Sequence, residues 1–150
     1  MQNITVFGHD LLYLGLYFFF WSAFGWCFEV IVRTLETGAF ENRGTLYGPI
    51  CPIYGVGVFI LDEFIPKTDS VFLFFVISAV VCTAFEFTVG CILKKLFNAM
   101  WWDYSWKRFN FCGLICLEST LGWGLGGVVT KYVLIPKIAI AMSYIFSHIP

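Results

Sequence analysis

The chain contains few charged residues and only two histidines. Of its 150 residues, 13% are charged and the formal net charge is -1, so no basic face exists that could neutralise nucleic-acid phosphates. The two histidines, His9 and His148, lie near the two ends of the sequence. The sequence therefore predicts no nucleic-acid partner and no metal site.

Three sequence signatures are also missing. The first ten residues carry no lysine, arginine or small-residue cleavage site, so we expect no signal peptide. The six cysteines show no Cys-x-x-Cys spacing and are expected to behave as small hydrophobic residues, with Cys112 and Cys116 as the remaining candidates for thiol chemistry. Because no Gly-x-x-x-x-Gly-Lys-Ser/Thr loop occurs, any ATPase would be a separate chain.

Apolar residues dominate instead: 59% of the chain is hydrophobic and its mean hydropathy is +0.82. We predict an all-α, polytopic membrane helix bundle with four transmembrane spans at about residues 11–32, 46–61, 71–93 and 109–129. The second span begins with Gly48-Pro49-Ile50-Cys51-Pro52, which favours an irregular or broken helix. Residues 131–137 are expected at the membrane interface, and residues 138–149 are too short to cross, which predicts a short C-terminal amphipathic segment.

Two short matches indicate an internal repeat. Phe28-Glu29 aligns with Phe85-Glu86 at an offset of 57, and Gly48-Pro49-Ile50-Cys51 aligns with Gly113-Leu114-Ile115-Cys116 at an offset of 65. We expect residues 11–66 and 71–136 to form two hairpins of two spans within a single transmembrane domain, residues 1–150. Hairpins with an even number of crossings share one orientation, as in parallel-repeat transporters.

Basic residues are concentrated in the loops after the first and third predicted spans. These loops hold six of them, against three on the other side, which are Lys67, Lys131 and Lys137. The bias predicts that both termini lie outside the cytoplasm, with a dual or inverted topology as the alternative.

Three glutamates, Glu29, Glu86 and Glu118, lie inside predicted spans. A charged side chain costs about 3 kcal/mol at the centre of a membrane helix, and such residues usually face a bundle interior and mark ion or substrate paths. Counting 1.5 Å per residue from the span ends places Glu86 and Glu118 deep in the membrane at similar levels. Glu29 is shallower and is followed one turn later by Arg33, which is placed to pair with it.

Small and polar residues share helical faces with these glutamates. Ser78, Cys82, Glu86 and Gly90 recur every four residues, and we expect this stripe to face inward. Gly122-x-x-x-Gly126 has the spacing typical of close contacts between membrane helices.

An aromatic and charged cluster lies between the third and fourth predicted spans. Its residues Trp102, Asp103, Tyr104, Lys107 and Arg108 are typical of a belt at the level of lipid headgroups. The alternative is that Asp103, Lys107 and Arg108 contact lipid phosphates or gate the cytoplasmic mouth.

Several motifs are similar to those of a known family. They are Gly25-Trp26 with Glu29, Asn42-Arg43-Gly44, Gly48 to Gly55, Trp102-Asp103-Tyr104-Ser105, Asn110 and Gly113-Leu114-Ile115-Cys116. Over about residues 18–136 the chain resembles the CmpB-type family of ABC-transporter type IV membrane proteins. The resemblance implies a small multi-pass protein of the bacterial cytoplasmic (inner) membrane with a role in transport.

These observations favour a transporter or permease with a glutamate-lined polar cavity and proton coupling or cation binding as the mechanism. The candidate substrate- or ion-binding residues are Glu29, Glu86, Glu118, Asn42, Arg43, Asn110 and Tyr54. We expect a homodimer or larger oligomer in the lipid bilayer, with a separate ATPase or permease subunit as a candidate partner, no cofactor and no catalytic residue. Two alternatives stay open: a membrane-embedded enzyme or lipid-binding protein that uses the carboxylates as acid and base, and an accessory subunit of a larger membrane complex.

Overall fold

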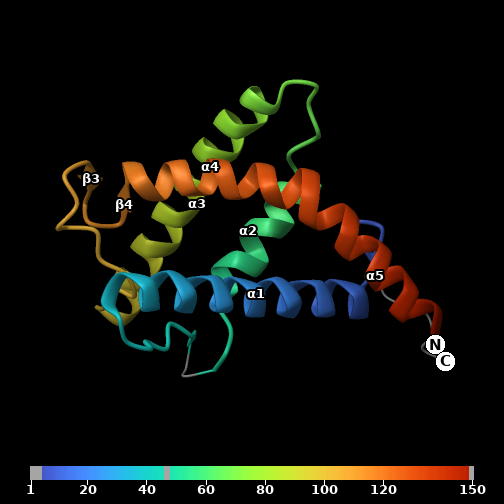
Figure 1. Ribbon diagram of the computed structural model, residues 1–150, viewed down its shortest axis with the longest axis horizontal. Coiled ribbons are helices and arrows are strands. Elements are labelled where there is room, and N and C mark those ends of the chain that lie inside the picture. The colour runs from blue at the N-terminus through green and yellow to red at the C-terminus, as the bar shows by residue number, and fades with distance from the viewer. Residues whose placement is uncertain (1–4, 46–47, 149–150) are drawn as a thin grey trace. The chain divides into compact units, whose positions relative to one another are not determined.

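A computed structural model of the chain describes residues 5–45 and 48–148, which are mostly helical (Figure 1). The α-helices are α1 (Leu11–Thr37), α2 (Pro52–Glu63), α3 (Val71–Phe97), α4 (Leu117–Val129) and α5 (Ile135–His148), and a π-helical turn, Thr130–Leu134, joins the last two. Two short antiparallel ribbons are formed by β1 (Thr5–Val6) with β2 (His9–Asp10) and by β3 (Asn110–Phe111) with β4 (Ile115–Cys116). The chain divides into two compact units, Met1–Phe59 and Ile60–Pro150, with the boundary inside α2.

Three helical stretches are long and apolar enough to cross a membrane: Leu11–Thr37, Val71–Phe97 and Leu117–Tyr144. At 1.5 Å per residue each is about 40 Å long, which exceeds the ~30 Å hydrocarbon core of a bilayer. Their apolar side chains are largely exposed on the chain, as expected of helices surrounded by lipid. The prediction of a helical membrane fold is confirmed, whereas four spanning helices are not.

The second predicted span is helical only from Pro52 onward. The 12 residues of α2 cover about 18 Å, too little to cross the membrane core. Proline is well suited to the first helical position, where its missing N–H needs no partner, and it disfavours helix in the residue before it. Residues 48–51 are accordingly irregular, as Pro49 and Pro52 predict, while residues 46–47 of this span lie outside the described residues.

The fourth predicted span, residues 109–129, begins too early in the sequence analysis. Residues 110–116 form a hairpin instead, in which Asn110 pairs with Cys116 and Phe111 pairs with Ile115. Its turn contains Cys112 at a φ of 56° and Gly113 at a φ of 68°, the left-handed region that glycine adopts without steric cost. The helix therefore begins only at Leu117, eight residues later than predicted.

The interfacial and amphipathic segments predicted after residue 129 are instead a continuation of the same helical run, which reaches His148 (Figure 1). Pro136 lacks the N–H that an α-helix would direct at the carbonyl of Tyr132, and its ring crowds the preceding turn. The π-helical turn accommodates this defect, because the Ile135 N–H bonds to the carbonyl of Thr130, five residues earlier.

In the first unit, α1 packs closely against the beginning of α2. Gly25 lies against the ring of Tyr54, and Gly55 lies against Ser22, so closely that a Cβ atom on either glycine would overlap its neighbour. The Cys51 N–H donates a hydrogen bond of 2.8 Å to the Ser22 carbonyl in the middle of α1. The irregular segment before α2 is thus hydrogen-bonded to α1 through Cys51.

In the second unit, α3 and α4 pack through small and hydroxylated residues. The Ser78 hydroxyl donates to the carbonyl of Gly124 at 3.3 Å, and the Thr83 and Thr120 hydroxyls bond at 3.1 Å. A Cβ atom added at Gly127 would lie 2.8 Å from Ser78. These contacts bring the two helices close, as small residues do in membranes.

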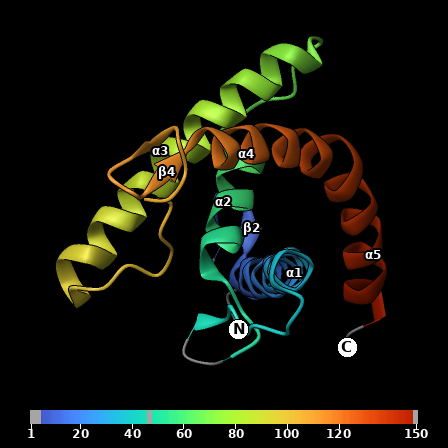
Figure 2. The same cartoon turned by 60° about the vertical axis from the view of Figure 1, so that its left-hand side comes forward.

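The predicted inward stripe of α3 is confirmed, because Ser78, Cys82, Glu86 and Gly90 are all buried. Figure 2 shows the β3–β4 hairpin beside α3, which is consistent with the contact between α3 and β4. The glycines of α4 that were predicted to make close helix contacts, Gly122 and Gly126, make none within the described part of the chain, because an added Cβ atom would meet nothing within 4 Å.

An ion-pair network fixes the segment that follows α1. Arg33 contacts Glu36 at 2.9 Å and Glu41 at 3.1 Å, and Arg43 contacts Glu41 at 3.2 Å. Partial desolvation acts to raise the pKa of Glu41, but hydrogen bonds and attraction from the two arginines more than offset it, so that this pKa is lowered.

We predict that Gly124→Leu destabilises the protein. A Cβ atom at this position would lie 2.7 Å from the Phe75 ring, and overpacking of this kind costs about 1–3 kcal/mol. Thermal unfolding in detergent, followed by tryptophan fluorescence, measures the effect. The matched control is Gly15→Leu in α1, where an added Cβ meets nothing within 4 Å; equal losses in both variants would contradict the packing described here.

A second prediction concerns the pH dependence of the Glu41 ion pairs. A carboxylate whose pKa is lowered by folding stabilises the folded state above its unfolded-state pKa, and this contribution disappears as the pH falls through the folded-state pKa. Glu41→Gln should therefore lower the melting temperature at pH 7, and the difference from wild type should vanish in acid. A melting-temperature difference between Glu41→Gln and wild type that stays constant down to the most acidic pH tolerated would refute the stabilising role of the Glu41 ion pairs. Substitution of the exposed Asp69 by Asn serves as the control.

Candidate functional site

Glu86 is the most deeply buried acidic side chain among the described residues. It lies on the inward face of α3, where it is only 4% exposed, and its Oε1 accepts a hydrogen bond of 3.1 Å from the Tyr104 hydroxyl. A carboxyl group in a membrane-length helix is costly unless it faces protein and is hydrogen-bonded. The structure places Glu86 on the protein-facing side of α3, with its Oε1 hydrogen-bonded.

Tyr104 reaches Glu86 because the segment between α3 and α4 is tightly folded. The Trp102 indole donates to the Leu114 carbonyl at 2.9 Å, and the Tyr104 N–H donates to the Gly113 carbonyl at 2.9 Å. Asn110 accepts from the Gly113 N–H at 3.1 Å and donates from its amide to backbone carbonyls of the same segment. Trp102 and Asn110 thus hold the loop that presents Tyr104.

Glu118 is not deeply buried, which corrects the sequence analysis. Because α4 begins at Leu117, Glu118 is in the first turn of the helix rather than about ten residues into a span. Its side chain is 56% exposed and contacts the Lys107 ammonium at 3.5 Å. Lys107 also lies over the Trp106 ring, 4.2 Å from its centroid. Glu118 therefore belongs to an exposed ion pair.

The two other charged residues of the predicted belt also have local partners. Asp103 accepts a hydrogen bond of 2.8 Å from the Ser105 N–H, and bonds from the side chain and backbone of Ser105 hold the Asp103 pKa below its usual range. The Arg108 guanidinium lies 5.4 Å from the centroid of the Phe109 ring. These contacts stabilise the loop locally.

Glu29 in the first unit has a tyrosine partner of the same kind. The Tyr54 hydroxyl, from the first turn of α2, donates to Glu29 Oε1 at 2.5 Å, and Glu29 is partly buried. Arg33, which the sequence analysis places as an ion-pair partner of Glu29, contacts Glu36 and Glu41.

Asn42 and Arg43 shape the segment between α1 and α2. The Asn42 side-chain oxygen accepts from the Trp26 indole at 2.8 Å and from the Gly44 N–H at 3.0 Å. The Arg43 carbonyl accepts from the Cys51 thiol at 3.4 Å. Like Asn110 in the second unit, Asn42 stabilises the segment that follows the long helix through side-chain hydrogen bonds.

The two units therefore share a local plan. Each contains a 27-residue helix that ends at a residue in the left-handed region, Gly38 after α1 and Asn98 after α3. In each, a segment follows whose described residues contain no α-helix, and a cysteine immediately precedes the next helix. In each, a tyrosine hydroxyl beyond the long helix donates to a glutamate on it. We call Tyr54 with Glu29 and Tyr104 with Glu86 the two Tyr–Glu pairs.

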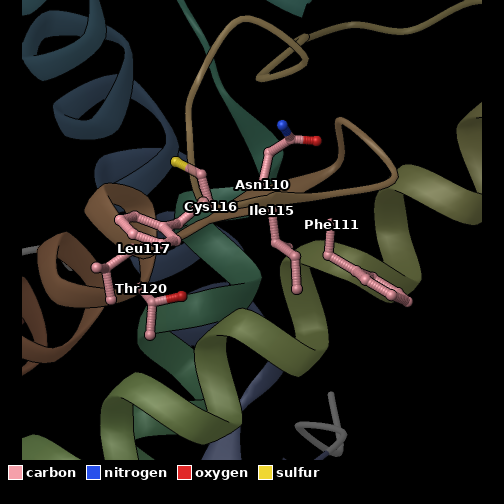
Figure 3. Close-up of a pocket in the computed structure, with 7 residues that line it drawn as sticks. Asn110, Phe111, Ile115, Cys116, Leu117 and Thr120 are labelled. Atoms are coloured by element: carbon pink, nitrogen blue, oxygen red, sulfur yellow. The ribbon is translucent and has the colours of Figure 1, made fainter.

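A shallow hollow of about 440 Å³ lies at the β3–β4 hairpin (Figure 3). In this view Leu117 and Thr120 lie on the α4 side, and the Phe111 ring extends over α3. The lining includes Asn110 and is otherwise mainly apolar, and none of the three glutamates contributes to it. This hollow is not the glutamate-lined cavity that the sequence predicts.

A buried ion pair escaped the sequence analysis. Lys131, on the π-helical turn, is 5% exposed and contacts Asp62 near the end of α2 at 2.9 Å. Lys131 was expected in an interfacial segment at residues 131–137, and Asp62 was not among the predicted site residues. Pro66 was a partial signal, since a proline four residues after Asp62 has no N–H to donate to the Asp62 carbonyl.

Comparison with known proteins identifies a family but no structural relative. No solved structure was found to match this chain. Residues 16–149 match the model of a membrane-protein family described as "Putative ABC-transporter type IV". Together with its three membrane-length helices, this match over most of its length shows that the chain is a multi-pass membrane protein and belongs to the ABC_trans_CmpB family.

Proposed function

We propose that this protein is a component of a transport system in the bacterial cytoplasmic membrane and that its two Tyr–Glu pairs exchange protons during transport. The observation that carries the proposal is Glu86, a buried carboxyl group on a membrane-length helix with a tyrosine hydroxyl 3.1 Å away. The family description supports the transport role.

The chemistry of the pair supports proton exchange. A tyrosine hydroxyl donates a hydrogen bond to an ionised carboxylate, and after rotation it accepts one from a protonated carboxylic acid. Each Tyr–Glu pair can therefore keep its hydrogen bond in both protonation states. An acid placed inside a membrane-length helix is also the arrangement found in intramembrane proton relays.

The similar arrangement of the two units supports an internal repeat as part of this proposal, with equivalent glutamates but with tyrosines on opposite sides of the cysteine that precedes the second helix. Residues 11–66 and 71–136 each supply one Tyr–Glu pair and one non-helical segment before a second helix. Non-helical backbone at membrane depth is tolerated where protein or a water-filled cavity satisfies it, and transporters use such segments around their binding sites.

The proposal predicts that Glu86→Gln abolishes proton movement. Glutamine is nearly isosteric and its carbonyl can accept the Tyr104 hydroxyl, so the fold should persist while the exchangeable proton is lost. The measurement is the decay of an imposed pH gradient in proteoliposomes that contain a trapped pH-sensitive dye. We expect flux with the wild type, flux at the level of protein-free liposomes with Glu86→Gln, and reduced flux with Tyr104→Phe.

The control for this experiment is Asp69→Asn, which removes an exposed carboxylate outside the three membrane-length helices and should leave flux unchanged. A Glu86→Gln variant with wild-type flux would refute the role of the pair. A wild type without flux at any gradient tested would refute proton transport by this protein alone.

A second candidate function is that of a subunit that associates through α4. The Gly122 and Gly126 side of α4 is open, and exposed Leu121 and Leu125 lie beside these glycines in the sequence. Small residues spaced four apart on an apolar helix allow another membrane helix to approach closely. The lipid-binding alternative has less support, because Arg43 and Lys107 are engaged in ion pairs and Arg108 lies over a ring.

The second candidate predicts a dimer or larger oligomer that depends on this surface. Native mass spectrometry from detergent should show the wild type and Gly15→Leu as oligomers and the Gly122→Leu/Gly126→Leu variant as a monomer. A wild-type monomer, or a double variant that remains oligomeric, would refute association through these glycines.

A further inference from the structure

We propose that the carboxyl end of α2 is a built site for a monovalent cation and that the ammonium group of Lys131 is its resident, tethered occupant. The Lys131 Nζ donates to the Asp62 backbone carbonyl at 2.6 Å and to Asp62 Oδ1 at 2.9 Å. The site thus combines a carbonyl oxygen with a carboxylate oxygen of the same residue.

Pro66 cannot donate a hydrogen bond to the Asp62 carbonyl. In a continuing α-helix, the Asp62 carbonyl would accept from the N–H of residue 66, and proline has none. Carbonyls in the last turn of a helix lack intrahelical partners and carry the negative end of the helix dipole. A cation is the favourable partner for such a group, and the Asp62 carboxylate adds a full negative charge.

The position of the ammonium depends on Pro136. This proline accounts for the π-helical turn Thr130–Leu134, from which Lys131 reaches Asp62 in the last turn of α2 and Tyr132 reaches the segment that follows α2. The Tyr132 hydroxyl donates to the Thr68 carbonyl at 2.8 Å and accepts from the Thr68 N–H at 3.2 Å. The turn therefore contacts both the end of α2 and the connection between α2 and α3.

Burial shows that the Lys131 ammonium is more than a surface partner. Lys131 belongs to the membrane-length stretch Leu117–Tyr144 and is only 5% exposed, whereas Lys137 on the same helical run is exposed. A buried ammonium is stable only when oxygen atoms replace its water. The two Asp62 oxygens supply that replacement here.

The proposal is tested by removing the tether and supplying the cation from solution. Lys131→Ala removes a three-carbon chain and its ammonium, so propylammonium is the matching probe. The purified variant is melted in detergent, followed by tryptophan fluorescence, in choline chloride and then with propylammonium, sodium or potassium at equal ionic strength. We expect a melting temperature several degrees below wild type in choline, and a saturable recovery of about half or more of this loss with propylammonium, as ligand binding to the folded state requires.

Two controls make the recovery specific. Lys137→Ala should show neither the loss nor the recovery, and Asp62→Asn/Lys131→Ala should show the loss without recovery, because the carboxylate is gone. Recovery with sodium or potassium that needs Asp62 would also support the cation site. A Lys131→Ala variant as stable as wild type, no recovery with any of the three cations, or an equal shift in all variants would overturn the proposal.

A second measurement applies if Lys131→Ala does not fold with or without the probes. Asp62→Asn keeps the carbonyl and removes the charge, and should melt well below wild type, whereas the exposed Asp69→Asn should not. An Asp62→Asn variant that melts with the wild type would overturn the proposal independently.

Discussion

The structure depends on one constraint: a polar group on a membrane-length helix must find its partner within the protein, because lipid offers none. The segments that follow α1 and α3 meet this requirement. In the first unit, the Cys51 N–H bonds to the Ser22 carbonyl and Tyr54 bonds to Glu29. In the second unit, Tyr104 bonds to Glu86. Polar residues that look isolated in an apolar sequence are therefore the points at which the chain folds back on itself. The small residues beside them, such as Gly25, permit the close approach that these bonds need.

Three prolines determine where this folding back begins and ends. Pro52 occupies the first position of α2, where the missing N–H costs nothing and where the preceding residue is kept out of the helix. Pro66 leaves the Asp62 carbonyl without a helical donor, and Pro136 converts the turn before it to π geometry. The last two features lie together, because the π-helical turn carries the lysine that donates to the Asp62 carbonyl. Pro66 and Pro136, each of which is unfavourable within a helix, thus both contribute to the contact between Lys131 and Asp62.

Sequence patterns predict the long helices well and the short elements poorly. α1 and α3 were predictable because residues 11–32 and 71–93 are mostly apolar, although the helices continue to Thr37 and Phe97. The stripe from Ser78 to Gly90 was predictable because its four-residue period matches a helix. The start of α4 was not, because the hairpin residues 109–116 are as apolar as a span and their strand pairing depends on hydrogen bonds that hydropathy does not record. That one boundary error moved Glu118 from a helix interior to a helix start. The burial of Lys131 was missed for a related reason. A lysine next to an apolar segment is typical of the membrane interface, and the sequence does not show that a carboxylate from another helix pairs with it.

The two Tyr–Glu pairs differ in a way that bears on how the proposed proton exchange would operate. Tyr54 is in the first turn of α2, and its ring is packed against Gly25, so separating it from the partly buried Glu29 requires movement of a helix. Tyr104 is in a loop, and the bond to the buried Glu86 can open if the loop moves while α3 and α4 keep their contacts. The loop is held by the Trp102 indole and by Asn110, both outside the membrane-length helices. The acid with the least access to water is therefore the one whose partner can move at the lower cost, since loop segments open more readily than packed helices do. On these grounds we expect the Tyr104–Glu86 pair to open at a lower cost than the Tyr54–Glu29 pair in the proposed exchange.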